Sequence, residues 1–195
     1  MSVIFGIVEN HEITIAGDKR GTSIKGGSPN DSINKVIMVN DQLAFAAAGN
    51  LAIATAIQMD INKSKNKEKI TVDNLLDIIK AFYQKLSDNG ATNILVYPFS
   101  FLIAGKNRNS EANLISGANI KGHLEAIEVP MALYPPEDVG NEECCNIFAR
   151  NYHLYRLEFV EKTIRDISDL SKFVSVTGDK WVYNITKGKG LLHTF

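Results

Sequence analysis

The chain has 195 residues, and its 21 Lys and Arg against 22 Asp and Glu leave a formal net charge of −1 at pH 7. This near balance gives no whole-molecule field for nucleic acid or anionic lipid, and a hydrophobic content of 45 % excludes an intrinsically disordered chain. We therefore expect a single domain over residues 1–195, with no nucleic-acid partner and no membrane partner.

The cysteines and the apolar stretches bear on the compartment. Cys144 and Cys145 are adjacent, a spacing that does not build a disulfide framework. The apolar stretches, such as Leu43 to Ala48, fall well short of the ~20 residues that a membrane span needs. The segment from Met1 to Val8 has no basic region and reaches Glu9 too soon for a secretion signal. These features predict a cytoplasmic protein.

Short segments rich in β-branched residues predict two strand pairs at the start of the chain. The first pair runs from Val3 to Val8 and from Glu12 to Gly17, and the second from Lys35 to Val39 and from Leu43 to Ala48. A loop with several glycines, Lys19 to Ser32, joins the two pairs.

Two helices are expected next. Asn50 is an N-cap for a helix from Leu51 to about Lys63, and Thr71 is an N-cap for a second helix that ends near Gly90. Strands are then predicted at Ile94–Tyr97, Phe101–Gly105 and Ala112–Ser116.

The second half is less regular. Prolines at Pro130 and Pro135-Pro136 predict an irregular segment, and Asp138 to Tyr152 is expected to be helical although it contains Gly140. A further helix has an apolar face made of Leu157, Val160, Ile164 and Ile167. Closing strands are predicted around Val174–Thr177, Trp181–Thr186 and Leu191–His193, with a turn at Gly178-Asp179.

The order of these elements is strands, two helices, strands, two helices and strands. Two sheets stacked face to face, with a helix pair on each outer side, satisfy this order because each helix has one apolar face to bury. The predicted fold class is therefore α+β, a four-layer αββα sandwich.

Common cofactor and metal signatures are absent from the sequence. It contains neither G-x-x-x-x-G-K-[ST] nor G-x-G-x-x-G after a strand. Its four histidines are scattered, with no pair at helix-face spacing and no cysteine beside them. We expect no cofactor and no metal ion.

Ser2 follows Met1 directly, and a methionine before a small residue is normally removed. Removal would leave Ser2 with a free α-amine, which titrates near ~7.7–8 and can act as a base at cellular pH. A hydroxyl and an amine on one residue form a nucleophile with its own base. Many proteins begin with Met-Ser, so this pair alone does not predict an enzyme.

A longer pattern follows Ser2. It consists of Ile13-Thr-Ile-Ala-Gly-Asp18-Lys-Arg20-Gly-Thr22, then Ile33-Asn-Lys35-Val36, then Leu43-Ala-Phe-Ala-Ala-Ala-Gly49 before a helix. This pattern resembles the β-type subunits of the proteasome family, including the bacterial HslV peptidase, within the N-terminal nucleophile (Ntn) hydrolases. The resemblance implies an Ntn hydrolase sandwich and hydrolysis of amide or peptide bonds.

The resemblance implies catalytic roles for six residues. Ser2 stands at the nucleophile, where the proteolytic members have Thr. Lys35 would lower the pKa of the Ser2 amine, and Asp18 would pair with Lys35. Taken singly, Asp18 and Lys35 are better explained by an ordinary ion pair between neighbouring strands; only the whole pattern favours an active site. The other three expected catalytic residues are Ser116 in Ser116-Gly117, and Asp166 and Ser168 in Arg165-Asp166-Ile-Ser168.

Four further residues are expected to bind the substrate. Thr22 would align an extended peptide through its backbone, and the backbone of Gly49 would help to hold the oxyanion. Ala47 would line the specificity pocket, and Arg20 would brace the loop around it.

The resemblance also implies a homo-oligomeric ring, and an ATPase unfoldase is the partner that such a ring would take. Two other functions stay open. The chain could be a catalytically idle assembly or binding protein with the same architecture, or an amidohydrolase that acts on a small metabolite.

Overall fold

The computed structural model describes residues 2–22, 28–91, 97–120 and 122–195. The strands are β1 (Ile4–Val8), β2 (Glu12–Asp18), β3 (Val36–Asn40), β4 (Leu43–Gly49), β5 (Phe99–Lys106), β6 (Ala112–Ile120), β7 (His123–Glu128), β8 (Met131–Tyr134), β9 (Gly178–Asn184) and β10 (Lys189–Thr194). The helices are α1 (Leu51–Lys63), α2 (Val72–Asp88), α4 (Asn141–Tyr155) and α5 (Phe159–Leu170), with a short 3₁₀ helix at Lys67–Lys69. Most of the predicted strand at Ile94–Tyr97 lies outside the described residues.

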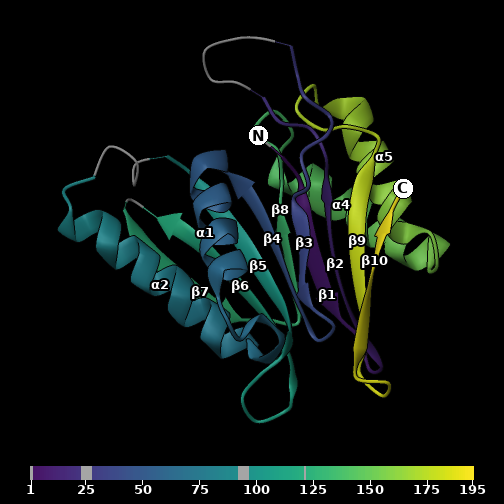
Figure 1. Ribbon diagram of the computed structural model, residues 1–195. Coiled ribbons are helices and arrows are strands. Elements are labelled where there is room, and N and C mark those ends of the chain that lie inside the picture. Colours follow the sequence, from purple (N-terminus) through teal and green to yellow (C-terminus); the bar gives the residue numbers. More distant parts are fainter. Residues whose placement is uncertain (1, 23–27, 92–96, 121) are drawn as a thin grey trace.

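The strands form two antiparallel five-stranded sheets, in the orders β10-β9-β2-β1-β8 and β3-β4-β5-β6-β7 (Figure 1). The two predicted strand pairs at the start of the chain are confirmed: β1 pairs with β2 and β3 pairs with β4. Each pair supplies strands to a different sheet. The first two pairs therefore face each other across the interior.

A buried apolar layer lies between the two sheets. Ile4 and Trp181 from one sheet, and Ala46 and Leu102 from the other, are fully buried members of this layer. Side chains alternate between the two faces of a strand, so Ala46 of β4 faces the opposite sheet while the neighbouring Phe45 faces the helices. The small residues of β4 thus allow the sheets to approach.

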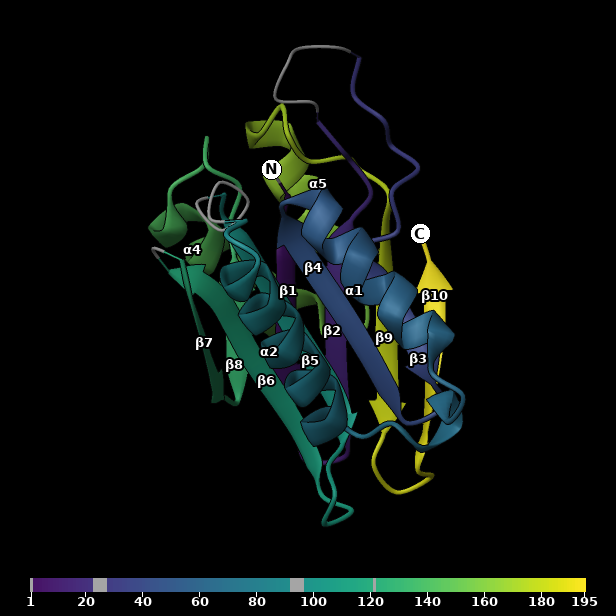
Figure 2. The same ribbon diagram turned by 60° about the vertical axis from the view of Figure 1, so that its left-hand side comes forward.

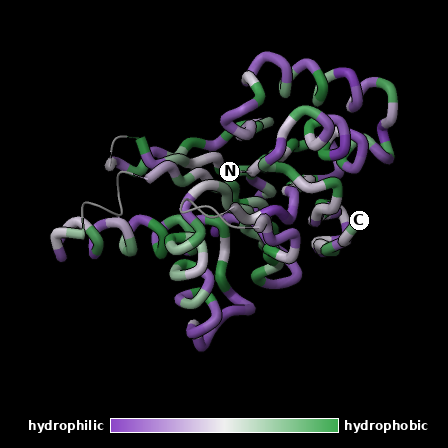
Figure 3. Tube along the Cα trace, turned by 90° about the horizontal axis from the view of Figure 1, so that it is seen from above, coloured by the Kyte–Doolittle hydropathy of each residue, from purple (hydrophilic) through white to green (hydrophobic). Residues whose placement is uncertain are grey.

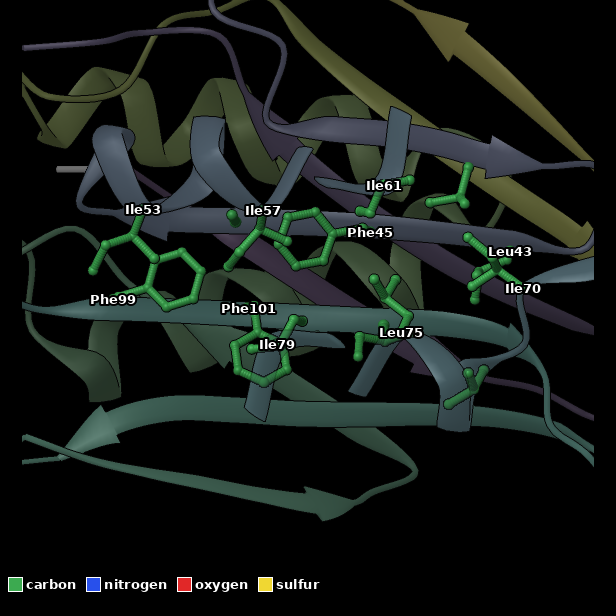
Figure 4. Packing of buried hydrophobic residues seen from close by; sticks show 14 of the residues in the cluster. Leu43, Phe45, Ile53, Ile57, Ile61, Ile70, Leu75, Ile79, Phe99 and Phe101 are labelled. Carbon is green, nitrogen blue, oxygen red and sulfur yellow. The ribbon is translucent and has the colours of Figure 1, made fainter. Parts of the chain in front are cut away.

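Helices α1 and α2 cover the outer face of the sheet that contains β4 and β5. Their apolar residues pack on the aromatic residues of those strands, as Figure 4 shows for Ile57 near Phe45 and Ile79 near Phe101. Both predicted caps are confirmed. The Asn50 side chain accepts from the backbone of Ala52, and Thr71 forms a capping box with Asn74.

Helices α4 and α5 lie on the outer face of the other sheet (Figure 2). They pack against Phe5 of β1. The rings of Phe148 on α4 and Phe159 on α5 both lie within ring-contact distance of Phe5. Viewed from above, hydrophilic and hydrophobic residues alternate along the helices (Figure 3), as expected for helices with one buried face. Leu157, predicted on the apolar face of the last helix, instead lies outside α5 and is 91 % exposed.

Two local predictions in the second half were wrong. The segment around Pro130 and Pro135 contains strand β8, whose residues pair with β1 while the prolines flank it. Gly178 and Asp179 do not turn the chain, because they open β9, where Asp18 pairs with Gly178. A side chain at Gly178 would meet the backbone oxygen of Gly17 at 2.8 Å, so close approach explains this glycine.

Gly140 does not interrupt α4, since it occupies the N-cap position.

The predicted fold class also needs correction. The prediction was an α+β, four-layer αββα sandwich, based on the order of the predicted elements and on the resemblance to the Ntn hydrolases. The described residues form a sheet-rich fold with ten strands in two antiparallel sheets and four helices. Strand β8, in the segment predicted to be irregular, and strand β7, for which nothing was predicted, complete the two sheets. The prediction of an Ntn hydrolase sandwich was therefore wrong.

None of the helices within the described ranges is long and apolar enough to cross a membrane.

Candidate functional site

Several strand ends meet at one end of the two sheets. Because β1 and β2 are antiparallel, with Ile4 opposite Gly17, the residues just before β1 lie beside the end of β2. In the other sheet Val36 lies opposite Ala46, so the start of β3 lies beside the end of β4. This end of the sheets gathers Ser2, Asp18, Lys35 and Gly49, which are far apart in sequence.

The Asp18 side chain is the centre of this arrangement, fully buried and accepting four hydrogen bonds. Its Oδ1 accepts from Lys35 Nζ at 2.6 Å and from the backbone N–H of Val3 at 3.0 Å. Its Oδ2 accepts from the backbone N–H groups of Arg20 at 2.8 Å and Ser175 at 3.2 Å. The carboxylate thus ties the start of β1, the loop after β2 and the segment before β9 to Lys35.

Lys35 crosses from one sheet to the other to reach Asp18. Its side chain is only 6 % exposed, and burial lowers the pKa of its ammonium group although the Asp18 carboxylate acts in the opposite direction. Lys35 Nζ and the Val3 N–H share one oxygen of Asp18. The ammonium group therefore lies next to the peptide group that joins Ser2 to Val3.

A cavity of about 400 Å³ opens beside this ion pair. Ser2 and Lys35 both line it, and Ser2 is 8 % exposed. The four predicted substrate-binding residues line the same cavity: Arg20, Thr22, Ala47 and Gly49. The sequence pattern and the cavity thus select the same group of residues around Ser2.

Arg20 braces the loop that forms one wall of the cavity. Its guanidinium group donates two hydrogen bonds of 2.7 Å to the two carboxylate oxygens of Asp31, and a third of 3.1 Å to the backbone oxygen of Lys172. The hydrogen bond from Arg20 keeps the pKa of Asp31 below its usual value. This engagement supports the bracing role expected for Arg20.

Gly49 ends β4 in a conformation that requires glycine. Its φ is +91°, and an added Cβ would lie 2.2 Å from the backbone oxygen of Pro98. The following residue, Asn50, donates its backbone N–H to the same oxygen at 2.9 Å and caps α1. The cavity wall therefore turns from strand to helix at Gly49.

We expect Gly49→Ala to lower the free energy of unfolding by about 2–4 kcal/mol, since a side chain there meets both the positive φ and the Pro98 carbonyl. Gly90→Ala is the matched control: Gly90 has φ +68° and nothing within 4 Å of an added Cβ, so it should lose only about 1–2 kcal/mol. Urea denaturation of both variants measures the difference. Equal losses would mean that the Pro98 carbonyl can move away.

Ser116 lies on β6, where its hydroxyl is 2.8 Å from the hydroxyl of Tyr134 on β8. Tyr134 is paired with Ile4 in the β1–β8 register, two residues from Ser2. The structure thus places Ser116 in contact with the strand beside β1.

Asp166 and Ser168 lie elsewhere. The Asp166 carboxylate accepts hydrogen bonds from Arg150 at 2.7 Å and Asn151 at 2.9 Å, both on α4. The Ser168 hydroxyl donates to the backbone oxygen of Arg165 at 2.7 Å. Because α5 stays helical through Leu170, the motif from Arg165 to Ser168 lies on this helix, and its Asp166 binds residues of α4. Neither residue is among the described residues that bind Asp18 or line the cavity.

Ser175 is a residue of the site that the sequence analysis did not predict. It is 2 % exposed, and its hydroxyl accepts from the backbone of Lys19 at 3.0 Å and donates to the backbone oxygen of Thr177 at 2.9 Å. These bonds hold the Ser175 N–H against Asp18. The only signal in the sequence is a Ser-Val-Thr-Gly segment before a strand, and it does not reveal that this strand pairs with β2.

The site offers no set of metal ligands: among the residues that the structure describes, no three His, Cys, Asp or Glu side chains form a group that could hold a metal ion.

No family model matches the chain, and no curated protein matches it either. The family resemblance of the N-terminal segment therefore stays a prediction.

Proposed function

We propose that the protein hydrolyses amide or peptide bonds with Ser2 as an N-terminal nucleophile, after cleavage of the bond between Met1 and Ser2. One observation carries the proposal. A single oxygen of the buried Asp18 carboxylate binds both Lys35 Nζ and the Val3 N–H, beside a cavity that Ser2 lines. A buried cation is thereby held next to the residue whose amine would act as the base.

The cation sets the protonation state of that amine. An ammonium group at Lys35 disfavours a second positive charge on the neighbouring α-amine, so the pKa of the amine falls and more of it is neutral at cellular pH. Asp18 compensates the buried charge of Lys35, and its bonds to three backbone N–H groups keep it in place. The Lys35–Asp18 ion pair thus allows the α-amine of Ser2 to act as the base, and no histidine is needed.

The reaction then proceeds in two halves. The α-amine takes the proton from Ser2 Oγ as this oxygen attacks the substrate carbonyl carbon, and a tetrahedral oxyanion forms. The carbon–nitrogen bond breaks, the leaving amine receives the proton, and an ester to Ser2 remains. Water then attacks the ester carbonyl and gives its proton to the α-amine. Collapse releases the acid, and the proton returns to Ser2 Oγ.

The cavity favours an extended substrate with an apolar side chain. Thr22 and Gly49 lie on its walls, where their backbone groups can align a peptide. The remaining lining includes the small Ala47 and the apolar Ile33 and Leu51. A large apolar side chain next to the bond that is cut would fill this space.

A homo-oligomeric ring, with an ATPase unfoldase as its partner, belongs to the same proposal. Leu51 and Met59 on α1 are 50 % and 56 % exposed and provide apolar surface for contact between copies. We also propose a cytoplasmic location. Cys144 and Cys145 are free thiols, as a reducing compartment would keep them.

The first test is the intact mass of the purified protein together with turnover of a set of fluorogenic peptides and small amides. Loss of Met1 with peptide turnover in a large assembly supports the proposal. Turnover of small amides alone, by a small oligomer, would favour a metabolite amidohydrolase. A chain that keeps Met1 and hydrolyses nothing, yet assembles, would be an idle assembly protein, and the proposal would fail.

A further inference from the structure

The hydroxyl of Tyr134 lies between two oxygens. It is 2.8 Å from Ser116 Oγ and 3.0 Å from the backbone oxygen of Gly117. A carbonyl oxygen can only accept a hydrogen bond, and a phenol has a single hydrogen to give. The Tyr134 hydrogen therefore points to Gly117, and the bond between the two hydroxyls must use the hydrogen of Ser116.

Tyr134 keeps that hydrogen over a wide pH range. Its ring belongs to the apolar layer between the sheets, and burial raises the pKa of its phenol above the usual value of 10.0. The direction of the two hydrogen bonds is thus fixed wherever the protein is folded at ordinary pH.

The packing of β1 against β6 places Ser116 at the same end of the sheets as Ser2. Gly6 of β1 faces Leu114 of β6, with 3.1 Å between an added Cβ and the leucine side chain. Two residues along β1 from Gly6, Ile4 is paired with Tyr134, which contacts Ser116, two residues along β6 from Leu114. The direction from Gly6 to Ile4 on β1 therefore matches the direction from Leu114 to Ser116 on β6, and it leads to Ser2.

The side chains also share a face. Ile4 and Leu114 both belong to the layer between the sheets, and strand side chains alternate. Ser2 lies two residues before Ile4, in a segment still tied to β2 by the hydrogen bond from Asp18 N–H to the Val3 oxygen. Ser2 and Ser116 are thus directed into the same layer, at the same end of the sheets.

We propose that Tyr134 is a positioning residue for Ser2. Its hydroxyl accepts the hydrogen bond that Ser116 donates, so Ser116 Oγ can only accept a hydrogen bond from the α-amine of Ser2. This inference rests on the proposed function, because the amine exists only after Met1 is removed.

The consequence concerns the lone pair of the amine. When an N–H of the amine donates to Ser116, the lone pair stays available for the proton of Ser2 Oγ. If Ser116 could turn its hydrogen toward the nitrogen, it would occupy the lone pair and stabilise the neutral amine. The amine would then have a lower pKa and would be a poorer base.

The test is the pKa of the Ser2 amine in chains from which Met1 has been removed. The rate at which acetic anhydride labels the N-terminus, followed by mass spectrometry of the N-terminal peptide over a pH series, gives this pKa without any need for turnover. In Tyr134→Phe it should fall by roughly 0.5 to 1 pH unit, and turnover should fall about fivefold or more with its acid limb shifted to lower pH.

Two comparisons separate positioning from packing. Tyr183→Phe removes a hydroxyl from the same layer at the other end of the sheets, where Tyr183 pairs with Ile13, and it should leave the amine pKa unchanged. In a Ser116→Ala background, Tyr134→Phe should have no further effect on the pKa, because the hydroxyl that it orients is gone.

An unchanged amine pKa in folded Tyr134→Phe, or an equal shift with and without Ser116, would overturn the inference. Neither result depends on catalysis. If the processed wild-type chain hydrolyses nothing while the pKa shifts as expected, the proposed function fails and the placement of Tyr134 stands. If wild-type turnover depends on Ser2 while the pKa stays fixed, the function stands and the role of Tyr134 fails.

Discussion

Ser2→Ala is expected to reduce hydrolysis by about 10³-fold or more, to the background of the assay, while the protein stays folded and assembled. The substitution removes one hydroxyl at the cavity wall and leaves the buried layers unchanged. Ser2→Thr should retain activity, because the β-methyl group restricts the rotamers of the hydroxyl. Alanine and threonine are small enough to allow removal of Met1, so the comparison isolates the hydroxyl from the amine.

Turnover, intact mass and gel filtration of the three proteins provide the measurement. A peptide epoxyketone supplies a second readout, since it needs a hydroxyl and an amine on one residue. It should add to the wild type and to the threonine variant but not to the alanine variant. If Ser2→Ala hydrolyses peptides as well as the wild type, the activity belongs to another site or to a contaminant.

The sequence predicted the centre of the site because that part depends on local order. Hairpin pairing places Asp18, at the end of β2, beside the start of β1, and it places Lys35, just before β3, beside the end of β4. The stacking of the two sheets then brings Lys35 to Asp18. The Ala-rich run of β4 and its closing Gly49 could also be read directly, since close sheet packing and a positive φ both select small residues.

The rest of the site depends on pairing between distant strands. Ser175 reaches Asp18 because β9 pairs with β2, and Tyr134 reaches Ser116 because β8 pairs with β1. Neither of these strand pairings can be predicted from the sequence around Ser175 or Tyr134. The motif at Asp166 was misleading for a different reason: its spacing is also compatible with the surface of a helix, and α5 extends through it. The prediction of an irregular segment around Pro130 was wrong because the prolines lie on either side of a short strand rather than within it.

Lys35 is expected to be the second residue on which turnover depends. Lys35→Met removes the charge and the hydrogen-bond donor, and it should lower turnover by about 10²–10⁴-fold because the Ser2 amine loses its tuning cation. It also leaves the buried Asp18 carboxylate with three backbone donors and no counter-charge, so the free energy of unfolding should fall by about 3 kcal/mol.

Two matched variants distinguish catalysis from stability. Lys35→Gln keeps a donor for Asp18 without the charge, so it should be more stable than Lys35→Met yet equally inactive. Lys35→Arg keeps the charge, but its planar guanidinium group does not fit the place of a compact ammonium group, so its turnover should also be low. Turnover and urea denaturation are measured for each variant. Near-wild-type turnover in folded Lys35→Gln would show that Lys35 is only the structural partner of Asp18.

The dependence of stability on pH tests the electrostatic part of this prediction. Burial lowers the pKa of Lys35 below the 10.5 of an exposed lysine. Between the lowered pKa and 10.5 the unfolded chain binds more protons than the folded chain, so the contribution of Lys35 to the free energy of unfolding rises with pH in this window. Below the window both states are protonated, and the full cost of burying the charge is present. The free energy of unfolding of the wild type, relative to Lys35→Met, should therefore increase as the pH approaches 10.5 in urea denaturation series. A decrease would mean that Asp18 raises the pKa of Lys35, and that attraction to the carboxylate outweighs burial.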